Sequence, residues 1–347
     1  METKKYFAGV NSGTGFYNYY NYLFDNNKEG FLYILKGGPG TGKSTLMKKV
    51  GLALEEAGEK VEYFYCSSDS CSLDGVRAVN ANIAVVDGTA PHTLDPSAPG
   101  AKEIIINLGE FIGENIKKNK QDIFKINDTK KELFTLAYKY ISSATSLNEA
   151  NRILYSTVNN DYVIDNISAQ LFDKIVHSNQ SNFTGERKLF ETAITPEGVL
   201  RFTDNNNYKE IVQLKGNLYS GELILQAFSE KLKKSGHNFT SFYSPLSPSI
   251  AESICVNDIL FTLCEGVKST SQIDLLDTVN IDNNTILAEI QENKKAIDSL
   301  VEKTHQTLYT CKIEHLKLEA MYSPCMDFVS ITEVTHRLIK QIKSLLI

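Results

Sequence analysis

A glycine-rich segment near the N-terminus has the residue types and the spacing that suit phosphate binding. The letters GGPGTGKS, from position 37 to position 44, fit the P-loop pattern G-x-x-x-x-G-K-[ST]. In a P-loop, backbone N–H groups at a helix N-terminus surround the β-phosphate, the lysine reaches the β- and γ-phosphates, and the hydroxyl binds Mg²⁺. The predicted nucleotide contacts are Gly37, Gly38, Pro39, Gly40, Thr41, Gly42, Lys43, Ser44 and Thr45, with Lys43 also catalytic and Ser44 also a metal ligand.

The segments on either side of this loop have the patterns that a P-loop requires. Residues 31–36 (FLYILK) form a short apolar and aromatic run that predicts a buried strand. After the loop, apolar residues recur at helical spacing until Gly58, which offers a C-terminal stop. The order of strand, glycine loop and helix is therefore predicted, and with it a site at the helix N-terminus.

A magnesium ion at such a site needs a second anchor, which is usually an aspartate at the end of a neighbouring buried strand. Residues 82–87 (NIAVVD) give four apolar residues followed by a carboxylate. We predict that Asp87 holds Mg²⁺ directly or through water, because Mg²⁺ tends to keep several of its waters. The predicted metal ligands are thus Ser44 and Asp87, and Asp87 is also a candidate catalytic residue.

The residue that would activate water does not follow directly from the motif. Many ATPases carry a glutamate straight after this aspartate, but the next residue here is Gly88. Asp69 follows a second predicted strand and His92 follows Asp87, so both are candidate catalytic residues in loops that face the ligand in open α/β sheets. Turn capping and a solvated loop histidine are the structural alternatives. Further candidates are Asp74 and Glu110, and Arg77 is the arginine nearest in sequence, although none of the arginines has the setting of an arginine finger.

Length and composition describe an ordinary globular protein. The 347 residues are enough for two domains, and 42% hydrophobic with 22% charged residues argues against global disorder. The net charge of -6 argues against a dedicated nucleic-acid binder. The start METKKYFAGV lacks the apolar core of a signal peptide, the apolar runs are strand-sized, and the six cysteines form no C-x-x-C pair. We expect a reduced, cytoplasmic protein without a membrane partner.

The chain also shows an internal repeat. The segment LKG…GKSTL at 35–46 recurs as LKG…GELIL at 214–225, and residues 7–15 resemble 190–198. Residues 64–65 resemble 242–243, and 83–88 resemble 261–266, which places Glu265 opposite Asp87. Amphipathic helical segments follow each part, at about 111–183 and 283–347, and Tyr155 and Tyr322 are matched within them. We predict two domains, 1–183 and 184–347.

The second copy of the loop lacks the groups that phosphate binding needs. Glu222 stands in place of Lys43, which puts a carboxylate where phosphate would lie, and Leu223 replaces the hydroxyl of Ser44. Nothing after Glu265 matches the segment 92–110. The fold class predicted is α/β, with two tandem P-loop NTPase-like three-layer α/β/α domains, helical extensions and a degenerate second copy.

The motifs ILKGGPGTGKST, YFYCSSDSCSLDGV, AVVDGTAPHTLDP with IINLGEF, and FETAITPEG carry a resemblance to a known family. With them the chain resembles, over almost its whole length, an uncharacterised bacterial family of tandem P-loop proteins, usually labelled ATPase or ATP-binding protein. The resemblance implies a P-loop NTPase fold in each half and nucleotide contacts at Gly37–Thr45. It supplies no substrate, and Glu222-Leu223 departs from a working second site.

These observations predict Mg²⁺-dependent binding and hydrolysis of a nucleoside triphosphate at a single site in the N-terminal half. ATP is expected over GTP, because no N/T-K-x-D guanine signature stands where a GTPase would carry it. One alternative is a kinase that passes the γ-phosphate to a small molecule held by the loops near Asp69 and His92. Another is a nucleotide-gated binding protein with little turnover, whose helical segments recruit a protein partner. Fold alone does not choose among these classes.

Overall fold

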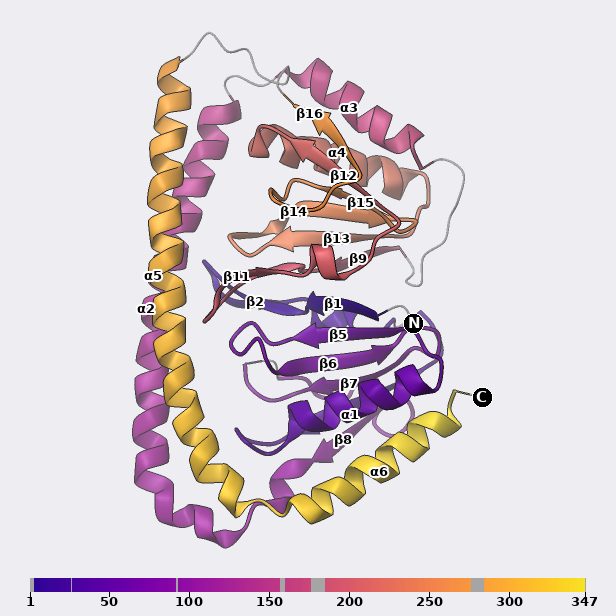
Figure 1. Ribbon diagram of the computed structural model, residues 1–347, viewed down its shortest axis with the longest axis vertical. Coiled ribbons are helices and arrows are strands. Elements are labelled where there is room, and N and C mark those ends of the chain that lie inside the picture. Colours follow the sequence, from indigo (N-terminus) through magenta and orange to yellow (C-terminus); the bar gives the residue numbers. More distant parts are fainter. Residues whose placement is uncertain are drawn as a thin grey trace.

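The computed structural model describes residues 3–25, 27–91, 93–156, 160–175, 185–275 and 284–346. Two α/β halves lie one above the other along the long axis of the molecule, and a pair of long helices runs along one side of both (Figure 1). The first half contains the glycine-rich loop, and the chain reaches the second half through the first of the long helices.

Six strands form the sheet of the first half in the order β1-β5-β6-β7-β4-β8. All of them run in one direction except β6, which pairs antiparallel with both of its neighbours. The elements are β1 (Thr3–Phe7), the hairpin β2 (Gly9–Ser12) and β3 (Gly15–Asn18), η1 (Tyr20–Tyr22), β4 (Phe31–Lys36), α1 (Lys43–Glu56), β5 (Val61–Tyr65), β6 (Leu73–Ala78), β7 (Ile83–Asp87), β8 (Glu103–Asn107), η2 (Leu108–Phe111), η3 (Glu114–Asn119), α2 (Lys120–Ser156) and α3 (Asp161–Asp173).

The second half repeats this topology strand for strand, in the order β9-β13-β14-β15-β12-β16 with β14 antiparallel to its neighbours. Its elements are β9 (Glu186–Leu189), the hairpin β10 (Thr192–Thr195) and β11 (Gly198–Arg201), η4 (Thr203–Asn205), β12 (Glu210–Lys215), α4 (Leu218–Lys234), β13 (Phe239–Ser244), β14 (Ser247–Val256), β15 (Ile259–Thr262), β16 (Ser271–Asp274), α5 (Asn284–Tyr322), η6 (Ser323–Cys325) and α6 (Phe328–Ser344). The predicted repeat is therefore visible as two similar halves.

Side chains along each strand alternate between two faces, as the pleat of a strand requires. In β4, Tyr33 and Leu35 pack under α1, whereas Leu32 and Ile34 join a core that both halves share. Among the described residues, that shared core is covered by η1 and loop residues and contains no residue of α1 to α6. The layer of helices that a three-layer α/β/α sandwich would place there is thus absent from the described part of the chain.

The last helix of each half packs against the other half. Leu171 of α3 lies in one core with Phe228 of α4, although α3 comes before the second half in the chain. In the same way, Leu338 and Ile342 of α6 pack with Val50 of α1. Figure 1 shows α3 beside α4 and α6 beside α1. The two sheets are therefore tied together by exchanged helices as well as by the chain itself.

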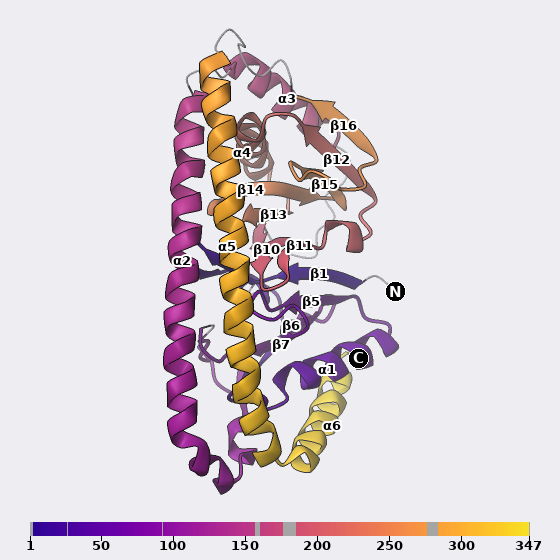
Figure 2. The same cartoon turned by 60° about the vertical axis from the view of Figure 1, so that its left-hand side comes forward.

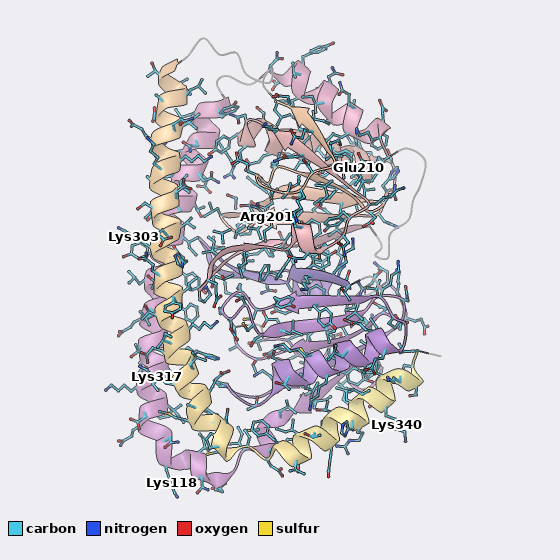
Figure 3. All side chains as sticks on the ribbon, in the orientation of Figure 1. Lys118, Arg201, Glu210, Lys303, Lys317 and Lys340 are labelled. Carbon is cyan, nitrogen blue, oxygen red and sulfur yellow. The ribbon has the colours of Figure 1, made fainter. Side chains whose placement is uncertain are left out.

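The long helices α2 and α5 form an antiparallel pair that spans both halves (Figure 2). Small and apolar side chains form the seam between them, for example Ala137 and Ile141 against Leu308. Charged side chains such as Lys317 lie on the outer side of the pair (Figure 3). This division of apolar and charged faces is the pattern of amphipathic helices, and it holds α5 along the first half down to the glycine-rich loop.

The halves also meet directly between the edge strands β1 and β9. Phe7 and Phe190 exchange backbone hydrogen bonds of 2.8 and 3.0 Å. Beside them, the buried Glu62 carboxylate accepts two hydrogen bonds of 2.7 Å from Arg187 and one of 3.3 Å from the fully buried Arg77. A charged group of the first half is therefore neutralised mainly by the second half.

Two sequence-based expectations need a correction or stay open. The sequence showed no counterpart to residues 92–110 in the second half, but β16 pairs with β12 as β8 pairs with β4. Strand β16 was missed because the connection that leads to it is shorter. The predicted division at residues 183 and 184 lies outside the described residues and stays a prediction. Within the described part of the chain, none of the helices is both long and apolar enough to cross a bilayer.

Candidate functional site

The glycine-rich loop joins the end of β4 to the start of α1, as the sequence predicted. Gly40 and Gly42 have positive φ values of 66° and 86°, which glycine adopts without the strain that a Cβ would cause. Gly42 is the N-cap of α1, and no side chain caps this helix end. The N-terminus of α1, with the partial positive charge of its free N–H groups, therefore opens onto the loop.

Lys43 is the first residue of α1, and its side chain folds over the loop. Its ammonium group donates hydrogen bonds of 2.8 and 2.9 Å to the carbonyl oxygens of Gly37 and Gly38. The same nitrogen lies 3.7 Å from an oxygen of Asp87, and both side chains are 12% exposed. The loop, the lysine and the aspartate that the sequence predicted as one site are thus brought together.

Ser44 and Asp87 offer oxygen ligands that suit Mg²⁺. The Ser44 hydroxyl accepts a 3.0 Å hydrogen bond from the Leu73 N–H, which fixes its position and leaves a second lone pair. One oxygen of Asp87 accepts hydrogen bonds from the N–H and hydroxyl groups of Thr89, while the other faces Lys43. Burial raises the pKa of Asp87 against the opposing charge of Lys43. Two oxygen donors fit a cation whose other ligands are phosphate and water.

The other predicted acidic residues have structural partners. Asp69 lies 2.9 Å from the ammonium of Lys312 on α5, and it accepts a 2.5 Å hydrogen bond from Ser72. Asp74 is buried and accepts a 2.9 Å hydrogen bond from the Tyr20 hydroxyl. It also raises the pKa of Asp87 through the repulsion of two nearby carboxylates. Asp69 therefore links its loop to α5, and Asp74 lies on the inner side of the site.

The remaining candidates contribute less to the described site. His92 lies outside the described residues, so its predicted role stays a prediction. Glu110 lies in η2, after β8. Arg77 is fully buried and bound to Glu62 and Asn82, so it belongs to the contact between the halves. Thr45 is exposed on the first turn of α1.

The C-terminal part of the chain covers the loop, which sequence reasoning missed. A Cβ on Gly40 would lie 2.8 Å from the Ser323 hydroxyl and 3.2 Å from the Glu319 carbonyl oxygen. Gly38 faces the ring of Tyr322 at 3.5 Å, and Gly42 faces the ring of Phe328 at 3.6 Å, measured from the same ideal position. The end of α5, η6 and the start of α6 therefore form one wall of the site.

Helix α5 also brings charged side chains to this wall. The pKa of the Glu319 carboxyl is raised by burial and by Asp69, against the opposing effects of Lys43 and a hydrogen bond from the Gly40 N–H. His315 lies one turn earlier, and burial together with Lys130 lowers its pKa to about 4, which keeps its ring neutral near pH 7. A helical pattern predicts such a helix but not what it touches, so no local signal reveals these residues.

The corresponding region of the second half has no phosphate loop. Only Gly216 and Asn217 separate β12 from α4, so the residues that match the first loop are taken up by the helix. In the first half, Leu35 pairs with Asp87, and the repeat matches Leu35 with Leu214. In the second half, Gln213 pairs with Thr262, so the next position along, Leu214, lies beside Leu263. Leu263 therefore stands where Asp87 lies in the first half. The predicted match of Glu265 with Asp87 is thus wrong by two residues. The described part of the second half therefore has neither the loop nor a carboxylate at the position of Asp87.

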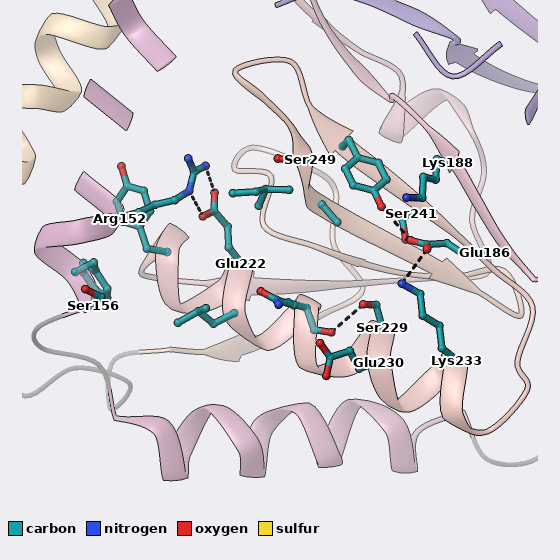
Figure 4. A pocket seen from close by; sticks show the side chains of 17 residues that line it. Arg152, Ser156, Glu186, Lys188, Glu222, Ser229, Glu230, Lys233, Ser241 and Ser249 are labelled. Atoms are coloured by element: carbon teal, nitrogen blue, oxygen red, sulfur yellow. Dashed lines mark hydrogen bonds and ion pairs between the residues drawn. The ribbon is translucent and has the colours of Figure 1, made fainter. Parts of the chain in front are cut away.

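Glu222, the residue that replaces Lys43, is held by an arginine. Arg152 of α2 donates two hydrogen bonds to its carboxylate at 2.7 and 2.9 Å, as Figure 4 shows. The pair lies at one end of a cavity of about 550 Å³ along α4, where Lys233 and Glu186 form a second ion pair at 2.9 Å. The cavity lies in the second half and does not include the glycine-rich loop.

A comparison with protein families places part of this site in context. Residues 18–85 match the model of the family described as Nephrocystin 3, N-terminal. The match includes β4, the glycine-rich loop and α1, and it ends before Asp87. None of the curated proteins and none of the solved structures compared with the chain matches it.

Proposed function

We propose that the chain binds a nucleoside triphosphate with Mg²⁺ at the loop Gly37–Ser44 and hydrolyses it. The observation that carries the proposal is the geometry of the loop, with Lys43 3.7 Å from the carboxylate of Asp87 and Ser44 at the same helix end. The matched family is one often associated with NTPases, which agrees with this reading. In this proposal the first half is a P-loop NTPase domain and the second half an inactive copy.

The roles of the residues follow from their chemistry. The N–H groups of the loop would bind the phosphates at the positive end of α1, and Lys43 would leave the carbonyl oxygens of Gly37 and Gly38 to neutralise the β- and γ-phosphate oxygens. Ser44 and Asp87 would hold Mg²⁺, which supplies charge neutralisation across the β- and γ-phosphates. We expect ATP to be the nucleotide, because the match to the guanine signature N/T-K-x-D at 119–122 lies where η3 meets α2 and does not follow a strand.

Phosphate release from ATP with Mg²⁺, without a second substrate, tests the proposal. We expect release by the intact chain and its loss in Lys43→Ala, because the alanine leaves the phosphate charge without its closest cation. Lys49→Ala is the matched control, since Lys49 is exposed on the same helix. Equal release by all three proteins would show that the activity does not come from this loop. Release that needs an added hydroxyl compound and yields its phosphate ester would instead assign a kinase.

A second candidate is a nucleotide-gated binding protein with little turnover. The specific observation in its favour is that α5 contacts the loop at one end and also packs against the hairpin β10–β11 of the second half. A nucleotide that moves the end of α5 would thereby alter a surface far from the loop. Tight Mg²⁺-dependent binding of ATP with no phosphate release in any mixture would favour this candidate over the ATPase.

A further inference from the structure

Glu319 lies beside Gly40 of the glycine-rich loop. It lies on the last turn of α5, and its backbone approaches Gly40 closely enough that a Cβ there would lie 3.3 Å from its Cα. Burial raises the pKa of its carboxyl, whereas the Gly40 N–H and the charge of Lys43 both lower it. These are the two kinds of group, a loop N–H and the loop lysine, that a P-loop offers to phosphate.

Two further residues hold Glu319 in this position. The ammonium of Lys130 on α2 lies 2.7 Å from Nδ1 of His315, and Nε2 of the same ring lies 3.7 Å from an oxygen of Glu319. Because the ring is neutral and Nδ1 accepts from the ammonium, Nε2 carries the hydrogen that faces the carboxylate. A polar chain therefore runs from α2 through His315 and Glu319 to the loop.

The second half contains the same arrangement with the charges exchanged. A single sequence offset relates Tyr155 to Tyr322, Asn160 to Asp327 and Ile164 to Ile331. The same offset matches the buried Ser168 and Leu171 of α3 with the buried Thr335 and Leu338 of α6. The same offset matches Arg152 with Glu319.

In the second half, Arg152 binds Glu222, which stands in place of Lys43 (Figure 4). In the first half, Glu319 is attracted by Lys43. Each long helix thus brings a side chain of opposite charge towards the residue at this position, which is Lys43 at the start of α1 or Glu222 on the second turn of α4. In the second half, where the loop is lost, this contact is a bidentate ion pair.

We propose that Glu319 is a built-in competitor for the nucleotide phosphates, which must displace its side chain from beside Gly40 in order to bind. The proposal rests on nucleotide binding at this loop. Displacement of Glu319 moves the end of α5 together with η6 and the start of α6. These segments move together because Tyr322, Ser323 and Phe328 pack on Gly38, Gly40 and Gly42 of the loop. Nucleotide binding is thereby coupled to the long helix pair and, through α5, to the second half.

Nucleotide affinity of the full chain tests the proposal. Glu319→Gln keeps the shape of the side chain and removes its charge, and Glu319→Ala removes the competing group altogether. We expect each variant to bind a fluorescent ATP analogue about tenfold more tightly or better, because a charge-assisted contact no longer has to be broken. Glu314→Gln is the matched control, since Glu314 lies on the same helix and pairs at 2.6 Å with Lys317, away from the loop.

The outcomes separate the proposal from the proposed function. Unchanged or weaker binding in both Glu319 variants, with wild-type binding that Lys43→Ala abolishes, would overturn the competitor role and leave the nucleotide site intact. A lack of binding in the wild type and in both Glu319 variants would overturn both, since removal of the carboxylate must open a functional loop. Circular dichroism spectra of the variants that match the wild type exclude loss of folding as the cause of any change.

Discussion

Glu62→Gln is expected to weaken the contact between the halves by a measurable amount. Glu62 is buried between Arg187 of the second half and Arg77 of the first. Burial alone would raise the pKa of the Glu62 carboxyl, but the two guanidinium groups outweigh it and lower this pKa from 4.5 to about 2. At roughly 1.4 kcal/mol per tenfold change in proton affinity, the ionised carboxylate stabilises the fold by about 3 kcal/mol. The amide of glutamine cannot replace that charge.

Urea unfolding followed by far-UV circular dichroism measures this loss. We expect Glu62→Gln to lower the free energy of unfolding by about 3 kcal/mol near neutral pH, which agrees with the usual cost of breaking a buried ion pair. The exposed Glu56→Gln is the matched control.

The pH dependence has a defined sign. The carboxylate is ionised in both folded and unfolded chains above the ordinary pKa of 4.5, so its contribution is complete there. It is lost as the pH falls from 4.5 towards about 2, and the gap between wild type and Glu62→Gln should close over that range. A difference within about 0.5 kcal/mol at neutral pH, or a gap that does not change on acidification, would refute this reasoning.

Three other substitutions test separate parts of the account. Ser44→Ala should weaken Mg²⁺-dependent ATP binding by about tenfold or more while leaving Mg²⁺-free binding nearly unchanged, which calorimetric titrations with and without the metal would reveal. Arg152→Ala should destabilise the fold by about 3 kcal/mol, because it leaves the carboxylate of Glu222 buried and unpaired, and combining it with Glu222→Gln should restore most of that loss in urea unfolding. Leu338→Ala should cost about 2–5 kcal/mol by opening a cavity between α6 and α1, whereas a cost below about 1 kcal/mol would mean that α6 does not pack there.

The parts of the site that are local in sequence could be predicted from the sequence. The strand before the loop, the loop itself and the helix after it depend on residues within a few turns of one another. Asp87 was predictable as well, because a carboxylate that ends a buried strand lies at the same sheet edge as the loop. These are cases in which periodicity and glycine spacing determine the local backbone.

Other features depend on contacts between distant segments, and no local pattern of residues reveals them. Glu319 and His315 look like any polar residues of a long helix, and only the antiparallel packing of α5 on α2 brings them to the loop. The exchange of α3 and α6 between the halves is hidden for the same reason. Comparison of the two repeats by residue similarity matches Glu265 with Asp87, whereas the strand register places Leu263 at that position.

Calorimetric titration of the full chain with Mg²⁺-ATP tests the central claim most directly. The account predicts saturable binding of a single nucleotide per chain, its loss in Lys43→Ala, and no change in Lys49→Ala. Binding that survives Lys43→Ala unchanged, or that reaches two nucleotides per chain, would contradict the assignment of the site to the loop Gly37–Ser44.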